Sequence, residues 1–258
     1  MIHGIDNRVR TAVNTQADQI KKEWLFKRPR LELPNIRRVS LTDIRNGAFQ
    51  KQFTGWYKMN IVEQNDEWWS GTPKDFTLKI LGGVRNWYKE FPLEKITHQY
   101  IVRDHFSTER WGRTNMQWYQ WFIFLHEIGK MTTMQKRNNT TTFVGHELAG
   151  AQLAAKWLTA IEMQPAATSY LQNMIVVSGL LDSLMHDPEL THKGVLIHAR
   201  KNLGKMSQYE LLELLILNLV TLEVSLLQEK NQSEYERKHS ITTRAFFEVL
   251  GDLELEHV

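Results

Sequence analysis

The segment Phe122–Lys130, FIFLHEIGK, places a histidine and a glutamate side by side at the end of an apolar run. A second segment, Phe143–Leu158 (FVGHELAGAQLAAKWL), follows a polar, threonine-bearing loop and carries another histidine beside a glutamate. Imidazole and carboxylate groups bind divalent metals where thiolates are absent. His126 and Glu127 could therefore hold a metal ion inside a helical bundle, with His146 as a candidate further ligand, or they could mark a helix end that meets solvent.

The rest of the chain is typical of an all-α fold. Apolar residues recur at helical spacing, and few segments alternate with the period of a strand. The pattern predicts helices over residues 8–26, 72–91, 97–106, 114–128, 145–162, 167–186 and 240–251. It also predicts a capped helix that begins at Ser207 and contains the apolar run to Leu227. A short strand or hairpin is expected between residues 55 and 69.

The N-terminal third differs in amino-acid composition from the remainder. Residues before about position 92 are rich in basic and aromatic side chains, whereas later residues form longer apolar runs. No Gly/Ser-rich linker separates the two parts. We expect a mainly helical N-terminal extension over residues 1–92, packed on a helical domain over residues 93–258.

Composition excludes several classes of protein. The 258 residues contain no cysteine, which rules out disulfides and thiolate metal sites. The 32 basic and 29 acidic residues leave a net charge of +3, so a concentrated basic face and nucleic-acid binding are not expected. The chain start lacks the apolar core of a signal peptide. The run Leu211–Leu227 contains two glutamates, too polar for a membrane span of ~20 residues. We therefore expect a cytoplasmic protein without membrane insertion.

Two common interpretations of these motifs can be set aside. Zinc peptidases of the H-E-x-x-H type need a second histidine four residues after the first, where this chain has Lys130 and Gly150. The aromatic cluster over residues 111–124 could form a base-stacking platform, but at helical spacing it is more typical of a packed core.

Taken together, FIFLHEIGK, the polar loop and FVGHELAGAQLAAKWL resemble the HD-domain superfamily, and among its members the HD subdomain of bacterial CCA-adding enzymes. The match is dense over residues 122–158 and loose over residues 95–186. Nothing before residue 92 matches, so no nucleotidyltransferase domain is expected. HD proteins are helical bundles that commonly hold divalent metals and hydrolyse phosphate esters of nucleotides. The resemblance thus implies an HD-like helical bundle.

The resemblance also implies a set of metal ligands. His126 takes the place of the motif histidine, and Glu127 that of the motif aspartate. His98 would be the upstream histidine, with His105, seven residues later, as the alternative. His146 would be the auxiliary histidine that closes a second metal position in some members. The implied ion is divalent manganese, iron, nickel, magnesium or zinc, all of which accept nitrogen and oxygen ligands.

The implied catalytic residues are Lys130 and Glu127. Lys130 occupies the position of the family's lysine near the phosphate-binding mouth, where an ammonium group would neutralise charge that develops on the phosphate. In such a site the ion would lower the pKa of a bound water and polarise a phosphoryl oxygen.

The sequence also departs from the family pattern. Glu127 replaces an aspartate, which moves the carboxylate outward by one methylene. Downstream, Ser178 and Gly179 stand where relatives have histidine. Where relatives have an inward aspartate on the late helix, this chain offers Asn218, Thr221 and Glu223.

Two main functions follow from this combination. The first is a metal-dependent phosphohydrolase that acts on a nucleotide or another phosphate ester. The second is a catalytically degenerate HD-fold protein that binds a ligand or a protein partner. A di-iron oxygenase is a third option, but it would need a fuller set of histidines and aspartates.

Overall fold

The computed structural model describes residues 33–256 except 67, 138–139 and 203–205. The described part is mainly helical, and its strands form short two-stranded pairs, which confirms the expected all-α class. Residues 34–258 form one compact unit, so residues 34–92 of the expected extension belong to the same unit as the later helices. The helix expected over residues 8–26 lies outside the described residues.

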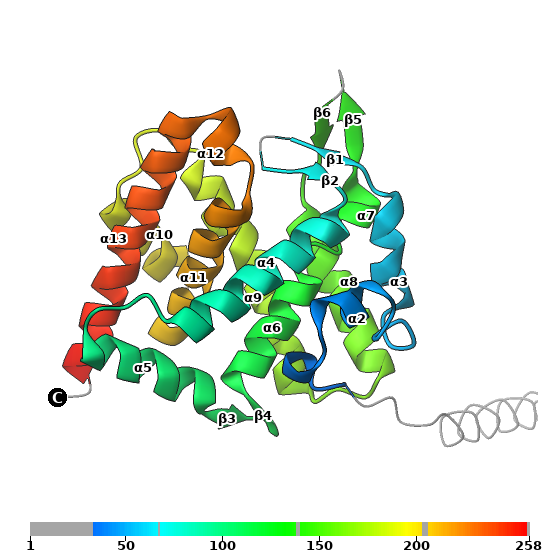
Figure 1. Cartoon of the computed structure of the whole chain (residues 1–258), viewed down its shortest axis with the longest axis horizontal. Coiled ribbons are helices and arrows are strands. Elements are labelled where there is room, and N and C mark those ends of the chain that lie inside the picture. Colours follow the sequence, from blue (N-terminus) through cyan, green and yellow to red (C-terminus); the bar gives the residue numbers. More distant parts are fainter. Residues whose placement is uncertain (1–32, 67, 138–139, 203–205, 257–258) are drawn as a thin grey trace, which may run out of the picture. The chain divides into compact units, whose positions relative to one another are not determined.

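Helices make up most of the unit (Figure 1). Those that precede His126 are η1 (Ile36–Arg38), α2 (Leu41–Arg45), α3 (Thr54–Tyr57), η2 (Lys58–Ile61), α4 (Pro73–Glu90), α5 (Ile96–Ser107) and α6 (Asn115–Leu125). Those that follow are α7 (Lys130–Thr133), α8 (His146–Ala160), α9 (Pro165–Met185), α10 (His192–Asn202), α11 (Gln208–Val224), α12 (Leu227–Lys230) and α13 (Gln232–Glu256).

In the described part of the chain, the strands form three antiparallel hairpins. The pairs are β1 (Gln64–Asn65) with β2 (Ser70–Gly71), β3 (Glu109–Arg110) with β4 (Arg113–Thr114), and β5 (Gln135–Arg137) with β6 (Thr140–Thr142). The first hairpin overlaps the region in which a strand or hairpin was expected. The other two close the turns on either side of α6 and α7.

Local capping chemistry explains where several helices begin. The Thr72 side chain accepts a hydrogen bond from the Asp75 backbone N–H (3.1 Å), and Pro73 occupies the first turn of α4. Ser207 and Glu210 form a reciprocal capping box at the start of α11, as the sequence predicts. Sequence periodicity missed α10 and underestimated α13, because both helices carry many polar and charged residues on their exposed faces.

The aromatic cluster forms the core rather than a platform. Trp118, Tyr119 and Trp121 on α6 are fully buried. Trp56 stacks on Phe124 at a centroid distance of 4.2 Å, and its indole N–H donates to the Phe124 carbonyl oxygen (2.6 Å). In Figure 1, α6 lies in the middle of the unit, and it contacts both α4 and α9. Its central position fixes the end of α6, and with it His126 and Glu127.

Candidate functional site

A close approach of two backbones brings the two motif segments together. Gly129 lies at the start of α7 and Gly150 lies within α8. A Cβ added to Gly129 would lie 1.8 Å from the carbonyl oxygen of His146 and 2.6 Å from the nitrogen of Gly150. Only glycine permits such contact between main chains. The glycines of HEIGK and HELAG therefore set His126 and His146 on the same side of the bundle.

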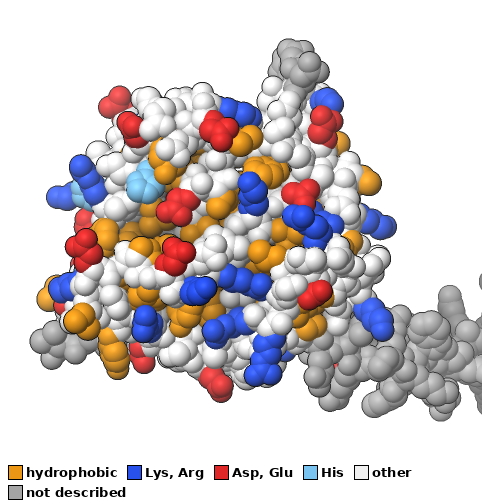
Figure 2. Space-filling model, in the orientation of Figure 1, with side chains coloured by type: hydrophobic (Ala, Val, Ile, Leu, Met, Phe, Trp, Pro, Cys, Tyr) orange, Lys and Arg blue, Asp and Glu red, His pale blue; other side chains and the backbone are white. Residues whose placement is uncertain are grey.

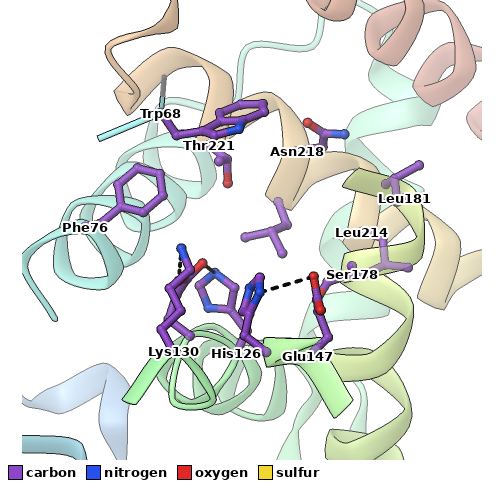
Figure 3. A pocket seen from close by; sticks show the side chains of 14 residues that line it. Trp68, Phe76, His126, Lys130, Glu147, Ser178, Leu181, Leu214, Asn218 and Thr221 are labelled. Carbon is purple, nitrogen blue, oxygen red and sulfur yellow. Dashed lines mark ion pairs between the residues drawn. The ribbon is translucent and has the colours of Figure 1, made fainter. Parts of the chain in front are cut away.

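The histidines and their neighbours line a cavity of about 100 Å³ (Figure 3). Its polar side comes from the end of α6, α7 and the start of α8 and carries His126, Glu127, Lys130, His146 and Glu147. The other walls come from the β1–β2 hairpin, α4, α9 and α11, and carry Trp68, Phe76, Ser178, Gly179, Leu181, Leu214, Leu217, Asn218 and Thr221. The site thus combines one ionisable wall with mostly apolar surroundings.

Both histidines are oriented by the main chain. Nδ1 of His126 lies 2.6 Å from the carbonyl oxygen of Ile123, and Nδ1 of His146 lies 2.9 Å from that of Phe143. A ring whose Nδ1–H donates to a carbonyl keeps Nε2 for another partner. For His126 this partner is the neighbouring carboxylate, with Nε2 3.2 Å from Oε1 of Glu127.

Glu127 and Lys130 form a buried ion pair on the polar wall. Both residues are nearly inaccessible, with 5% and 6% of their surface exposed, and the Lys130 ammonium contacts Oε2 of Glu127 directly. The Lys130 ammonium also lies 3.4 Å from Oε1 of Gln64 and 5.1 Å from the centre of the Phe143 ring. Burial raises the pKa of the Glu127 carboxyl, but the Lys130 ammonium and the two histidines lower it to well below its usual range.

The structure places His98, the expected upstream ligand, away from this pocket. His98 lies on α5, and its Nε2 is 3.5 Å from Oε2 of Glu254 on α13. Its ring packs near Phe247 of the same helix, at a centroid distance of 6.2 Å. The sequence showed that the helix carrying His98 precedes α6. It could not show that the face of α5 with His98 packs against α13.

The alternative ligand, His105, belongs to a different buried cluster. Its Nε2 lies 2.8 Å from Oε1 of Glu213, a fully buried residue of α11. The other Glu213 oxygen accepts a hydrogen bond from the Tyr170 hydroxyl, and the His105 ring stacks on Tyr209 at 4.5 Å. Burial and the nearby Glu213 carboxylate raise the pKa of Tyr170 well above its usual value. These contacts tie α5, α9 and α11 together.

The pocket does not fit the metal site that the resemblance implies. Among the residues that the structure describes, no three histidine, aspartate or glutamate side chains are arranged to hold an ion. The Glu127 carboxylate already faces an ammonium group, and the opposite wall offers the neutral side chains of Ser178, Asn218 and Thr221. A hard divalent ion normally needs further anionic or imidazole ligands from several helices.

Some lining residues were not expected from the sequence. Glu147 follows His146 directly, and its Oε1 lies 3.4 Å from Nδ1 of that histidine. A Cβ on Gly179 would fall 2.1 Å from Cγ of Glu147, so the glycine of α9 makes room for this side chain. The H-E pair of HELAG could have suggested Glu147, whereas no local signal marks Trp68 or Phe76 as pocket residues.

The comparisons with known proteins add no family assignment. No protein-family model matches the sequence, and no curated protein matches it significantly. None of the helices in the described part of the chain combines the length and apolar character needed to cross a bilayer.

Proposed function

We propose that the protein is a catalytically degenerate relative of HD hydrolases whose pocket binds a small organic ligand. The buried Lys130–Glu127 pair supports this proposal most directly, because it engages the carboxylate that an ion would need. The Lys130 ammonium neutralises the Glu127 carboxylate, so this carboxylate needs no external cation. The remaining polar groups are then free to select a ligand by hydrogen bonding.

The pocket walls indicate the chemistry of that ligand. Apolar side chains line much of the cavity outside the polar wall, and Asn218 and Thr221 lie across from Lys130 and His126 (Figure 3). The volume of about 100 Å³ is smaller than the ~300–1,000 Å³ of sites for drug-sized molecules. The polar wall carries two carboxylates, Glu127 and Glu147, against the single ammonium of Lys130. A neutral molecule of one ring, with an amide or hydroxyl group, matches these features better than a phosphate dianion.

A fragment-binding experiment tests the proposal. We expect single-ring amides and alcohols, such as benzamide and benzyl alcohol, to bind the full chain in saturation-transfer NMR. Thr221→Leu should weaken their binding about tenfold, because it fills the cavity and removes a hydroxyl, a change of ~1.4 kcal/mol. Thr159→Leu, at an exposed position of α8, is the matched control and should leave binding unchanged.

Metal-dependent phosphohydrolysis is the competing function, and the same protein samples test it. A bound ion would stabilise the folded state, so the melting temperature would rise with added Mn²⁺, Ni²⁺, Mg²⁺ or Zn²⁺ and fall with chelator. p-Nitrophenyl phosphate and bis(p-nitrophenyl) phosphate would then be hydrolysed, and His126→Ala would abolish the activity. We expect neither effect. Hydrolysis lost in His126→Ala, or failure of every neutral fragment to bind, would contradict the binding proposal.

A further inference from the structure

A second cleft, of about 760 Å³, lies apart from the pocket described above. It is bounded by η1, α4, α5 and α6, and shares no lining residue with the first pocket. In Figure 2, several lysine and arginine side chains gather in the lower middle of the face, where α4, α5 and α6 lie in Figure 1. The volume falls within the ~300–1,000 Å³ range of small-molecule sites.

The cleft carries an uncompensated positive charge. Arg37, Arg85, Lys89 and Arg103 line it, against the single carboxylate of Asp104. Among the described residues, none of these four cations forms an ion pair with a carboxylate. The near-neutral balance of the whole chain therefore hides a local excess of cations, and such an excess in a cleft attracts anions.

One of the cations is fixed in place by neutral groups. The Arg85 guanidinium donates to the carbonyl oxygens of Ile36 (2.6 Å) and Val39 (2.9 Å), and its Nε lies 3.4 Å from Oε1 of Gln120. The carbonyl oxygens orient the guanidinium, but they are uncharged and do not neutralise it. Burial lowers the pKa of Arg85, and the nearby positive charge of Arg37 lowers it further, because like charges repel. A bound anion would relieve this repulsion.

Two tyrosines give the cleft an aromatic side. Tyr88 packs edge-on against Phe106 (5.8 Å), and the Arg37 guanidinium lies 5.9 Å from its ring centre. Tyr100, on α5, leaves 65% of its surface exposed, so its ring is accessible to a ligand in the cleft. Aromatic faces beside cationic side chains are the surfaces on which nucleobases stack.

We propose that this cleft binds a nucleoside polyphosphate. The phosphates would lie on the cationic side formed by Arg37, Lys89 and Arg103, and the base would stack on Tyr100. The charge excess accounts for the phosphates, the exposed ring accounts for the base, and the volume suits one nucleotide. This site is independent of the ligand pocket proposed above, since the two are lined by different residues.

Fluorescence anisotropy of N-methylanthraniloyl-ATP with the full chain tests this proposal. We expect saturable binding that competes with ATP and weakens when NaCl rises from about 50 mM to about 500 mM, because salt screens exposed charges. The double variant Arg37→Gln with Arg103→Gln should weaken binding at least tenfold. The control variant, Lys51→Gln with Lys156→Gln, makes the same change in charge at exposed positions outside the cleft and should bind as the unmodified chain does.

Comparing ATP with inorganic tripolyphosphate, which lacks the base, tests whether the base contributes to binding. Tyr100→Leu should weaken the binding of ATP about tenfold and leave the binding of inorganic tripolyphosphate unchanged, because only the nucleotide has a base that can stack on the ring. Several outcomes would overturn the proposal: no binding of the nucleotide, equal loss in the control variant, or equal affinity for ATP and tripolyphosphate. Tight binding of a single-stranded octanucleotide with no binding of ATP would also overturn it and would assign the cleft to nucleic acid.

Discussion

Replacing Gly129 by alanine is expected to lower the free energy of unfolding by about 3 kcal/mol or more, near the upper end of single-residue effects. The added methyl group would lie 1.8 Å from the carbonyl oxygen of His146. This neighbour is main chain, so no side-chain rotation can relieve the overlap, and α7 must move away from α8. Chemical denaturation followed by circular dichroism measures the loss.

Gly251→Ala is the matched control for this substitution. Gly251 lies in α13, and a Cβ there would meet no atom within 4 Å. Alanine should therefore stabilise the protein by about 0.5–1 kcal/mol, because it favours the helix over the unfolded chain. If Gly129→Ala were as harmless as this control, the contact between α7 and α8 would not hold the two histidines together.

Glu127→Gln is expected to destabilise the protein by about 3 kcal/mol, because it leaves the Lys130 ammonium buried without a counter-charge. Lys130→Met should also destabilise, since it removes the ammonium that neutralises Glu127. The double variant Glu127→Gln with Lys130→Met should lose less than the sum of the two, because neither charge then remains. Urea denaturation of the four proteins at pH 7 gives the coupling free energy.

The exposed pair Glu63–Lys136 is the control for this pair. Its atoms lie 2.8 Å apart, yet the side chains are 60% and 52% exposed. Glu63→Gln should change stability by less than ~1 kcal/mol, because water and salt screen surface ion pairs. A neutral effect of Glu127→Gln, comparable with this control, would show that the buried carboxylate has another role.

The buried Glu127–Lys130 pair predicts how stability depends on pH. The pKa of Glu127 is lower in the folded state than its ordinary value of 4.5, so its stabilising contribution is complete above that value. As the pH falls below about 4.5, the unfolded chain takes up the proton first, and this contribution is progressively lost. We expect a shallower loss of stability between pH 5 and pH 3 in Glu127→Gln, measured by thermal unfolding at each pH. Equal slopes in both proteins would contradict the inferred pKa.

Much of the secondary structure could be predicted from the sequence. The side chains of Thr72 and Ser207 accept hydrogen bonds from the backbone N–H three residues later, and the structure confirms both caps. The helices α10 and α13 were missed or shortened, because their many polar and charged residues weaken the periodic signal of the apolar positions. The region before α4 combines short helices with a hairpin, and no single period describes it.

Four of the residues that the sequence singled out lie together in the structure. His126, Glu127, Lys130 and His146 do line one pocket, and the glycines beside them explain why. The opposite wall includes Ser178, Gly179, Asn218 and Thr221, which are among the positions at which the sequence differs from the family pattern that it resembles. Trp68 and Phe76 come from segments without any motif, so their part in the site could not be predicted.

The sequence alone determined that the chain is mainly helical, where several of the longer helices begin, and which two segments carry His126 and His146. Tertiary structure decided which side chains meet. His98 pairs with Glu254 on α13, and His105 with Glu213, which lies 108 residues away along the chain. Periodicity shows which residues share a face of a helix, but it does not show which neighbour that face contacts. That choice depends on packing among several helices at once, and it separated His98 from the pocket that it was expected to complete.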